Sequence, residues 1–329
     1  MADKNRAFKL LVLMYHRIAL AETDPWELCV SPENFEQQLQ VLKSEYNVIS
    51  IPDLLQQIAD NKICRDAVSI TFDDGYTDNF TNAKPLLEKC NYPATFFMAT
   101  GLTGRQKLFW WDELGNIILQ ITYLPTFLSI KIGNNVLTHY LLEPALTTEM
   151  HALHKHWKYY EDGPTDRCNL YLKLWESLLP LSSEEIDVVI NSLRRWAGAN
   201  ISADNLSFPM TNSQVKQLAM NELFLLGIHT ITHPDLSITN KNDQVKEISG
   251  SKSDLEKSSH SIEPTILAYP YGRYNGLTLA VARRLNIAAC FTTEQKTINT
   301  EADLRLLGRF QVKNWNGEEF EKQLKAWMS

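Results

Sequence analysis

The chain has 329 residues, and its 32 basic and 39 acidic side chains give a formal net charge of −7. An acidic balance argues against nucleic acid as the main partner, although it leaves room for a local basic patch. The length suits one large domain or one domain with a big insertion, and 44% hydrophobic residues suffice for a sizeable core.

The apolar run near the N-terminus is short. Leu10–Tyr15 follows a charged start and stops at His16 and Arg17, so we expect a buried first strand rather than a signal peptide. No segment approaches the roughly 20 apolar residues of a membrane-spanning helix. The five cysteines are scattered and include no Cys-x-x-Cys pair, which favours reduced thiols. The sequence therefore predicts a soluble, cytoplasmic protein without a membrane span.

Strands and helices alternate over the first third of the chain. Ser31 and Pro32 have the cap and first-turn positions of a helix, and Phe35, Leu39 and Leu42 share one face of it. This alternation predicts a parallel sheet or barrel. The expected elements are strand Leu10–Met14, this helix, strand Asn47–Ile49, a helix opened by Pro52, strand Val68–Phe72, a helix to about Cys90 and strand Ala94–Met98.

The alternation breaks near Gly101. Two apolar runs flank Gly133–Asn135 and predict a β-hairpin, and the last of three following helices has a capping box formed by Ser182 and Glu185. We therefore expect residues 105–205 to form an inserted, mostly helical subdomain. Its expected elements are hairpin strands Leu128–Ile132 and Val136–Leu141 and helices around 147–160, 166–179 and 184–197.

The alternation resumes at about Ser213, so residues 1–104 and 206–329 are expected to fold together. The expected elements here are strands Phe224–Ile228, Ile266–Ala268, Ala288–Thr292 and Arg309–Val312 and a closing helix of about Glu318–Met328.

Polar clusters follow four of the apolar, strand-like runs. In a βα barrel, residues at the C-terminal ends of the strands form the active-site face. Convergence of the strand ends would bring the four clusters together. They are Tyr15–Arg17, Thr71–Tyr76, His229–His233 and Tyr269–Gly272.

Two of these clusters together indicate a metal site. His229 and His233 are one helical turn apart, and two histidines with one carboxylate make a hydrolytic site with open positions for water and substrate. Asp73 and Asp74 are costly after a buried strand unless a positive charge lies nearby. Taken alone, the histidines could occupy a solvated turn and the aspartates a helix cap or turn. The combination favours a metal, with one aspartate as ligand and its neighbour as general base.

The runs Ser69–Tyr76 and Tyr269–Gly272 and the pair His229 and His233 resemble the polysaccharide deacetylase family, also called the NodB-homology or carbohydrate esterase 4 family. The resemblance lies outside the insertion. It implies a distorted (β/α)7–8 barrel and an enzyme that removes the N-acetyl group from an N-acetylated amino sugar or polysaccharide.

The resemblance also implies roles for single residues. Asp73 would be the catalytic base. Asp74, His229 and His233 would bind a divalent metal, most often zinc, with cobalt or nickel as alternatives. The backbone N–H of Tyr271 would donate to the oxyanion of the reaction.

Three family features are missing here. The arginine that orients the base is replaced by Ala268, the Asp-x-x-Asp-Trp motif is absent, and no histidine follows His260 to serve as the late general acid. Some members with a permuted arrangement have this acid in an N-terminal Met-Tyr-His run. The same run ends at His16, which we predict as the general acid, with a structural histidine as the alternative. Arg17 or Arg309 could replace the missing arginine.

The insertion contains Trp110 and Trp111, and indole rings stack well on sugar faces. They are candidates for a substrate wall, and packing inside the insertion is an equal alternative. Arg17 and Arg309 complete the set of candidate substrate-binding residues.

The sequence thus predicts a metal-dependent carbohydrate N-deacetylase that releases acetate. A related C–N hydrolase, such as a deformylase or cyclic-amide hydrolase, a catalytically inactive sugar-binding relative and a purely structural α/β domain are the rival interpretations. A cytoplasmic location would favour a nucleotide-linked, lipid-linked or small amino sugar as substrate. The sugar and the oligomeric state are left open.

Overall fold

The computed structural model describes residues 8–63, 65–198, 208–258 and 265–329, so His260 lies outside the described part. The chain divides into two compact units. The barrel unit comprises Met1–Leu20, Leu28–Gly104 and Pro209–Ser329, and the inserted unit comprises Ala21–Glu27 and Arg105–Phe208.

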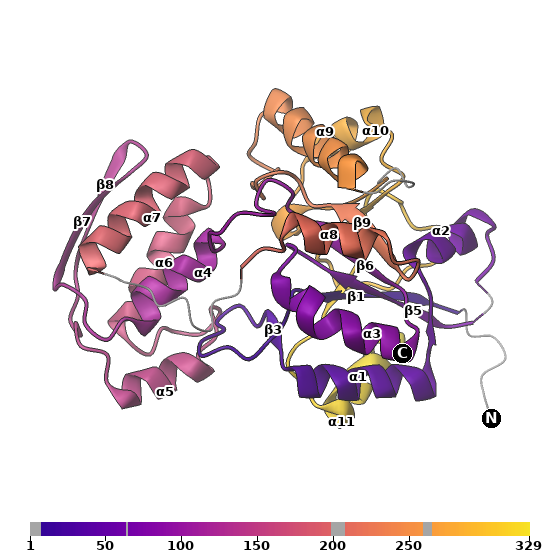
Figure 1. Ribbon diagram of the computed structural model, residues 1–329, viewed down its shortest axis with the longest axis horizontal. Helices are drawn as coiled ribbons and strands as arrows, with labels where there is room; N and C mark the ends of the chain where they lie inside the picture. The colour runs from indigo at the N-terminus through magenta and orange to yellow at the C-terminus, as the bar shows by residue number, and fades with distance from the viewer. Residues whose placement is uncertain (1–7, 64, 199–207, 259–264) are drawn as a thin grey trace. The chain divides into compact units, whose positions relative to one another are not determined.

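A parallel sheet forms the centre of the barrel unit (Figure 1). Its strand order is β11-β10-β9-β6-β5-β1-β12, with β4 paired to β5 beside this path. All its described pairings are parallel, as the βα alternation predicts. The strands are β1 Leu10–Tyr15, β4 Asn47–Val48, β5 Ala67–Phe72, β6 Ala94–Met98, β9 Phe224–Ile228, β10 Ile266–Ala268, β11 Ala289–Phe291 and β12 Phe310–Gln311.

The two ends of this strand order approach each other through one segment. Leu307 forms a parallel bridge with Phe291 of β11, and three residues later Phe310 pairs with Leu13 of β1. The predicted distorted α/β barrel is thereby confirmed, with irregular closure between β11 and β12.

Helices cover the barrel strands. Ser31 accepts a hydrogen bond from the Asn34 N–H and caps α1, as its sequence predicts, and Phe35, Leu39 and Leu42 are fully buried beneath it. Helix α1 packs against α3 and α11, and α9 packs against α8 and α10 (Figure 1). The helices are α1 Pro32–Glu45, α2 Ile51–Ala59, α3 Lys84–Cys90, α8 Asn212–Ala219, α9 Lys241–Ser258, α10 Gly276–Arg284 and α11 Gly317–Met328.

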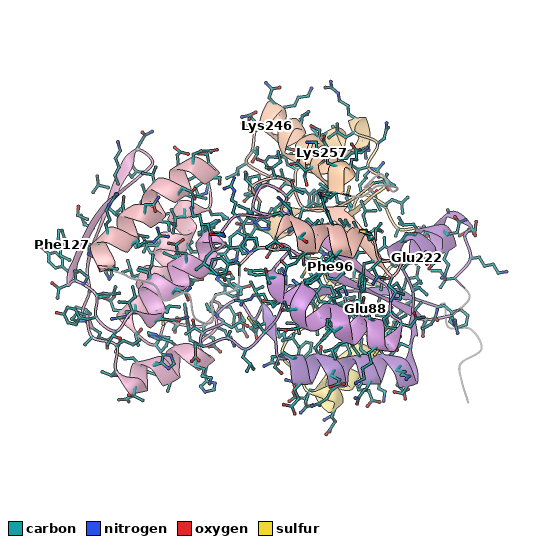
Figure 2. The ribbon with its side chains drawn as sticks, in the orientation of Figure 1. Glu88, Phe96, Phe127, Glu222, Lys246 and Lys257 are labelled. Atoms are coloured by element: carbon teal, nitrogen blue, oxygen red, sulfur yellow. The ribbon has the colours of Figure 1, made fainter. Side chains whose placement is uncertain are left out.

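The strand register sets where polar residues leave the core. Every residue of β1 and β5 is buried, because helices cover the sheet. Tyr15 pairs with Phe72, and the rings of Tyr15, Phe72 and Phe96 stack in series in the core. Figure 2 labels Phe96 among the side chains of the barrel unit. His16 and Asp73 come next along their strands, so both are placed at the same edge of the sheet.

The inserted unit is a hairpin with helices, and helix α7 packs against strand β7. The predicted hairpin and the capping box of Ser182 and Glu185 are both confirmed. A short parallel pair, β2 Arg17–Ile18 and β3 Cys29–Val30, joins the ends of the loop that contributes Ala21–Glu27. The elements of the inserted unit are α4 Trp110–Gly115, β7 Phe127–Ile132, β8 Asn135–Tyr140, α5 Thr148–His156, α6 Asp166–Leu178 and α7 Ser183–Ala197.

Among the described residues, no helix combines the length and the apolar character that a membrane crossing requires.

A buried arginine stabilises the inserted unit. Arg167 of α6 is fully buried and donates to the backbone carbonyls of Ile118, Ile121, Glu143 and Pro144. These carbonyls would lose their partner together if the guanidinium were removed.

We therefore expect Arg167→Met to lower the free energy of unfolding by about 3 kcal/mol, because buried carbonyls would be left unsatisfied. Denaturant unfolding followed by circular dichroism measures this loss. Arg195→Met, at an exposed position of α7, is the matched control and should stay within about 0.5 kcal/mol of the wild type. Equal losses in the two variants would contradict this role of Arg167.

Candidate metal and catalytic site

The candidate site lies where the barrel strands end. Asp73 and Asp74 follow β5, and His229 follows β9. Strand β6 pairs with both β5 and β9, so their C-terminal ends lie at one edge of the sheet. The Asp73 N–H donates to Tyr15 O at 2.9 Å, and the His229 N–H donates to Met98 O at 3.1 Å. The backbone thus continues the sheet to the first site residues.

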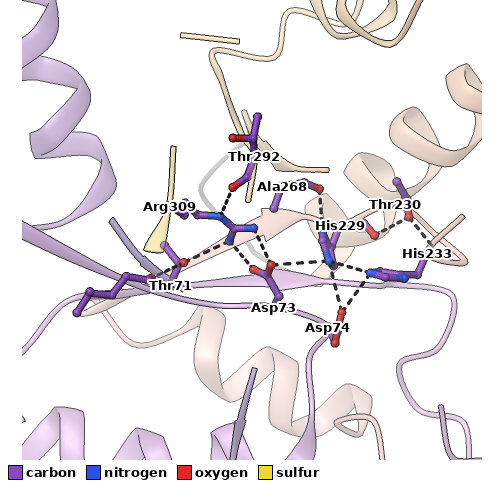
Figure 3. Close-up of polar contacts among 10 residues, drawn as sticks. Thr71, Asp73, Asp74, His229, Thr230, His233, Ala268, Thr292 and Arg309 are labelled. Carbon is purple, nitrogen blue, oxygen red and sulfur yellow. Dashed lines mark hydrogen bonds and ion pairs between the residues drawn. The ribbon is translucent and has the colours of Figure 1, made fainter. Parts of the chain in front are cut away.

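Asp74, His229 and His233 form a buried group whose candidate ligand atoms all lie within 4.8 Å of one another (Figure 3). Asp74 Oδ1 is 3.4 Å from the Nε2 atom of each histidine, and the two Nε2 atoms are 3.2 Å apart. Asp74 Oδ1 makes no hydrogen bond to any described residue. Two imidazole nitrogens and a carboxylate oxygen are a donor set that suits a divalent transition metal.

The hydrogen bonding of His229 orients it towards the other candidate ligands, and the pKa values of the two histidines are shifted in opposite directions. His229 Nδ1 lies 2.8 Å from Ala268 O, so the Nδ1–H donates to this carbonyl and Nε2 faces Asp74 and His233. Burial lowers the pKa of His229, but the Asp73 and Asp74 carboxylates raise it by more. For His233, burial dominates and lowers the pKa to about 3, which keeps this imidazole neutral.

The pKa of Asp74 is lowered below its ordinary value. Burial opposes the charged form, but the nearby imidazoles, His229 first among them, outweigh it. Among the described residues, no lysine or arginine forms an ion pair with Asp74, and its partners are the imidazoles of His229 and His233. A carboxylate in this setting is a good fit for a bound cation.

Backbone strain is concentrated at this site. Asp74, Thr230, His233 and Tyr271 have positive φ angles of 72°, 65°, 60° and 57°. Residues other than glycine adopt such angles at a cost of about 1–3 kcal/mol each. The surrounding contacts must therefore hold them in place.

One anchor of the histidine loop is Glu247 of α9. Its carboxylate accepts hydrogen bonds at 2.8 Å from the N–H groups of Ile231 and Thr232 and from Thr232 Oγ1. The Thr230 hydroxyl also accepts from the His233 N–H at 3.0 Å. Glu247 could not be predicted from the sequence, because nothing in its helix distinguishes it from the surrounding polar residues.

Asp73 is paired closely with Arg309, and its Oδ2 atom also lies 4.0 Å from His229 Nε2. Two nitrogen atoms of the fully buried guanidinium lie 2.7 Å from the two carboxylate oxygens, and Arg309 Nε donates to Thr292 O at 3.1 Å (Figure 3). Burial raises the pKa of Asp73, but Arg309 and His229 lower it more, so the carboxyl is ionised at neutral pH. Arg309 therefore contacts the aspartate directly, and its burial separates it from solvent.

His16 lies at the same sheet edge and is half-buried. Its backbone carbonyl accepts a hydrogen bond from Asn79 Nδ2 at 2.8 Å. Its Nδ1 atom is buried without a hydrogen-bond partner among the described residues. The ring is near enough to contribute to lowering the pKa of both Asp73 and Asp74, after the larger effects of Arg309 and His229.

Tyr271 lies in the short 3-10 turn Pro270–Gly272 after β10. Its ring packs edge-on against His233, with the centroids 4.5 Å apart. Gly272 has φ +66°, and a Cβ there would come within 2.1 Å of Thr293 Oγ1. Only glycine allows this turn.

The remaining predicted site residues have other surroundings. Arg17 forms an ion pair with Asp78 at 3.2 Å and lies over the Tyr76 ring. Trp110 and Trp111 belong to the inserted unit, and they are only 9% and 7% exposed. This burial supports the packing alternative for the two tryptophans.

A second missed contact links two site loops. Arg273 forms an ion pair at 2.7 Å with the buried carboxylate of Asp235, which follows the His233-Pro234 turn. The Asp235 carboxylate also accepts from the Ser237 N–H and hydroxyl.

Comparison with known proteins agrees with this geometry. The family model for polysaccharide deacetylases matches residues 60–122 and 160–290. The chain belongs to the polysaccharide deacetylase family. The predicted family and the predicted carbohydrate N-deacetylase are thereby confirmed. Such enzymes act on acetylated polysaccharides and are metal-dependent in general, and Asp74, His229 and His233 form the candidate metal site.

Individual relatives are distant in sequence. YxkH of Bacillus subtilis (strain 168), which carries the family's name, is 23% identical over 306 residues, or 92% of this chain and 71% of YxkH. The Streptococcus pyogenes deacetylase PplD in complex with acetate has a TM-score of 0.59 and 22% identity, covering 98% of this chain and 100% of PplD. IcaB from Ammonifex degensii has a TM-score of 0.59 and 17% identity, with 98% of each chain covered. These structures confirm the fold.

The buried pair of Asp73 and Arg309 predicts a pH-dependent effect on stability. Arg309→Met should lower the free energy of unfolding at pH 7 by about 3–5 kcal/mol, because it leaves an uncompensated buried carboxylate. The native pKa of Asp73 should then rise above its unfolded value of about 3.9. The deficit should therefore shrink as the pH falls towards that value, where Asp73 becomes protonated in the variant.

Urea unfolding of the chelator-treated protein at a series of pH values measures this dependence. The double variant Asp73→Asn/Arg309→Met is the control, because it removes both charges and should show a smaller and pH-independent deficit. A deficit in Arg309→Met that stays constant with pH would contradict the assignment.

Proposed function

We propose that this protein is a metal-dependent hydrolase that removes N-acetyl groups from amino-sugar residues of a polysaccharide and releases acetate. The observation that carries the proposal is the convergence of Asp74, His229 and His233 beside a second carboxylate, Asp73, which is ion-paired with Arg309. Membership of the polysaccharide deacetylase family supports the substrate class. The S. pyogenes relative was solved with acetate, the acid that such a reaction releases.

Asp74 Oδ1 and the Nε2 atoms of His229 and His233 would hold the metal. Zinc fits this donor set best, and cobalt or nickel would also suit it. Bound there, the metal supplies Lewis-acid activation of the acetamide carbonyl and of water.

Asp73 is the proposed general base. It is ionised at neutral pH and can take the proton of the attacking water. Arg309 is the positioning residue for this base, because its two-pronged contact fixes the plane of the carboxylate. Because Arg309 is buried, positioning the base suits it better than direct substrate binding. Arg309 would thereby take the place of the family arginine whose position is occupied by Ala268.

Two groups complete the reaction. The backbone N–H of Tyr271 is the proposed donor to the oxyanion, held by the tight turn that Gly272 permits. His16 is the proposed general acid. As the C–N bond breaks, the nitrogen leaves with a proton from the imidazole, giving acetate and the free amino sugar. Arg17, Trp110 and Trp111 stay proposals for substrate binding.

A cytoplasmic location is also kept as a proposal. Among the described cysteines, Cys90, Cys168 and Cys290 are free thiols, which suits a reducing compartment.

Chelation should abolish acetate release from N-acetylated amino-sugar oligomers, and zinc, cobalt or nickel should restore it. Asp74→Ala, His229→Ala and His233→Ala should each lower the metal content sharply, because each removes one of three protein ligands. Metal content by mass spectrometry and acetate release measure the two effects. Asp166→Ala, in the inserted unit, is the control and should keep its metal.

Full metal content in all three ligand variants would contradict the assignment. A panel of N-acyl substrates tests the reaction itself, since faster release of formate or opening of a cyclic amide would favour the rival C–N hydrolase.

His16→Ala should keep metal and fold but lose about 10²-fold or more in kcat on an N-acetylated sugar, because an amine leaving group needs a proton. The loss should be much smaller on an aryl acetate ester, whose leaving group needs none. Steady-state kinetics on both substrates measures the difference. His151→Ala, at a half-buried position of the inserted unit, should behave as the wild type. Equal losses on the two substrates would rule out His16 as the acid, and metal loss would make it a ligand.

A further inference from the structure

A series of aromatic rings runs through the inserted unit. Trp26 stacks on Tyr159 with centroids 4.2 Å apart and lies 4.4 Å from the ring of Trp175. Trp175 in turn lies 6.1 Å from Trp110, which contacts Trp111 at 5.6 Å. The series is buried at its Trp111 end and reaches the surface at Tyr159, which is 43% exposed.

The exposed end of this series is rigidly supported. Trp26 Nε1 donates to the hydroxyl of the buried Tyr171 at 2.7 Å, and the Tyr159 N–H donates to Pro25 O at 3.0 Å. The next residue, Tyr160, is 60% exposed, and its hydroxyl donates to Glu27 at 3.3 Å. Its ring is nearly perpendicular to that of Tyr159. Two ordered tyrosine rings thus form a corner on the surface.

The two chain segments that form this corner are acidic. The two segments that form it, 21–27 and 158–162, contain five carboxylates and one lysine. Lys158 donates to the backbone carbonyl of Asp24, and His151 lies 3.8 Å from Glu22. The surface therefore combines aromatic rings with an excess of negative charge. The carboxylates are Glu22, Asp24, Glu27, Glu161 and Asp162.

We propose that this corner, formed by Trp26, Tyr159 and Tyr160 with their surrounding carboxylates, binds amino-sugar chains that carry free amines. The apolar face of a pyranose ring fits the exposed face of an aromatic ring that is held in place from behind. An ammonium group is attracted both by carboxylates and by the face of an aromatic ring. Acetylated sugars are neutral and would gain only from stacking.

The proposal rests on the proposed function for the source of the ligand. Removal of acetyl groups turns a neutral polymer into a cationic one, so partly processed chains are the species that this surface favours. A surface of this kind would hold the enzyme on polymer that it has already begun to process.

Isothermal titration calorimetry of the full chain with a glucosamine oligomer and with the matching N-acetylglucosamine oligomer tests the proposal. The glucosamine oligomer should bind about tenfold more tightly, in line with an added cation–aromatic and ionic contact. Tyr159→Ala should weaken its binding about tenfold, and Tyr159→Phe should retain it, because the ring is kept. Tyr140→Ala is the matched control, since Tyr140 is a 73% exposed tyrosine of the same unit and lies in the hairpin.

The double variant Glu161→Gln/Asp162→Asn tests the contribution of the carboxylates. It removes two negative charges and should therefore bring the Kd values of the two oligomers closer together. Tyr160→Ala gives a second test of the ring contact if Tyr159→Ala does not fold. The proposal is overturned if neither oligomer binds, if the acetylated oligomer binds as tightly as the free amine, or if Tyr140→Ala weakens binding as much as Tyr159→Ala.

Failure of the proposed function can be recognised separately. The titrations need no turnover and can be repeated with Asp73→Asn, which should bind the glucosamine oligomer as the wild type does. If the oligomer binds but no acetate is released, the proposed reaction is contradicted and the proposed sugar site still stands. Acetate release without oligomer binding would contradict the proposed sugar site and leave the proposed reaction in place.

Discussion

Two adjacent carboxylates are buried at the end of strand β5, and each needs a compensating positive charge. Asp73 obtains it from Arg309, with two contacts of 2.7 Å. Asp74 has no arginine or lysine among the described residues and faces His229 and His233 instead. Burial holds His233 neutral, so His229 is the imidazole of this pair whose pKa the carboxylates raise. A divalent cation would complete the compensation and would give each carboxylate a different role.

The same constraint explains the unusual backbone around the site. Both aspartates follow one strand directly, so Asp74 can turn away from its neighbour only through a left-handed conformation, which Gly75 continues with φ +87°. His233 has positive φ as well, and the three hydrogen bonds to Glu247 hold its loop. Helix α9 therefore helps to position His233 by holding the backbone of its loop. Arrangements of this kind cost stability at the site and are maintained by the surrounding core.

The sequence predicted the parts of the fold that depend on local patterns. The β-prone runs of β1 and β5 indicated strands, and Ser182 and Glu185 indicated a helix start. The partners of the site residues were harder to predict, because they are remote along the chain. Arg309 is 236 residues from Asp73 and reaches it only through the irregular closure between β11 and β12. Sequence spacing does not reveal that closure. The sequence alone therefore could not show which of Arg17 and Arg309 contacts Asp73.

The aromatic residues of the inserted unit show a similar limit. Trp110 and Trp111 stand out in the sequence because they are adjacent, whereas Trp26 stands alone and far from them. In the folded unit these rings belong to one series, and burial increases from Tyr159 towards Trp111. A sugar can stack only on a ring that solvent reaches. The buried tryptophans therefore stabilise the series from within, and the residues available for recognition are those at its exposed end, where the loop of residues 21–27 contributes Trp26.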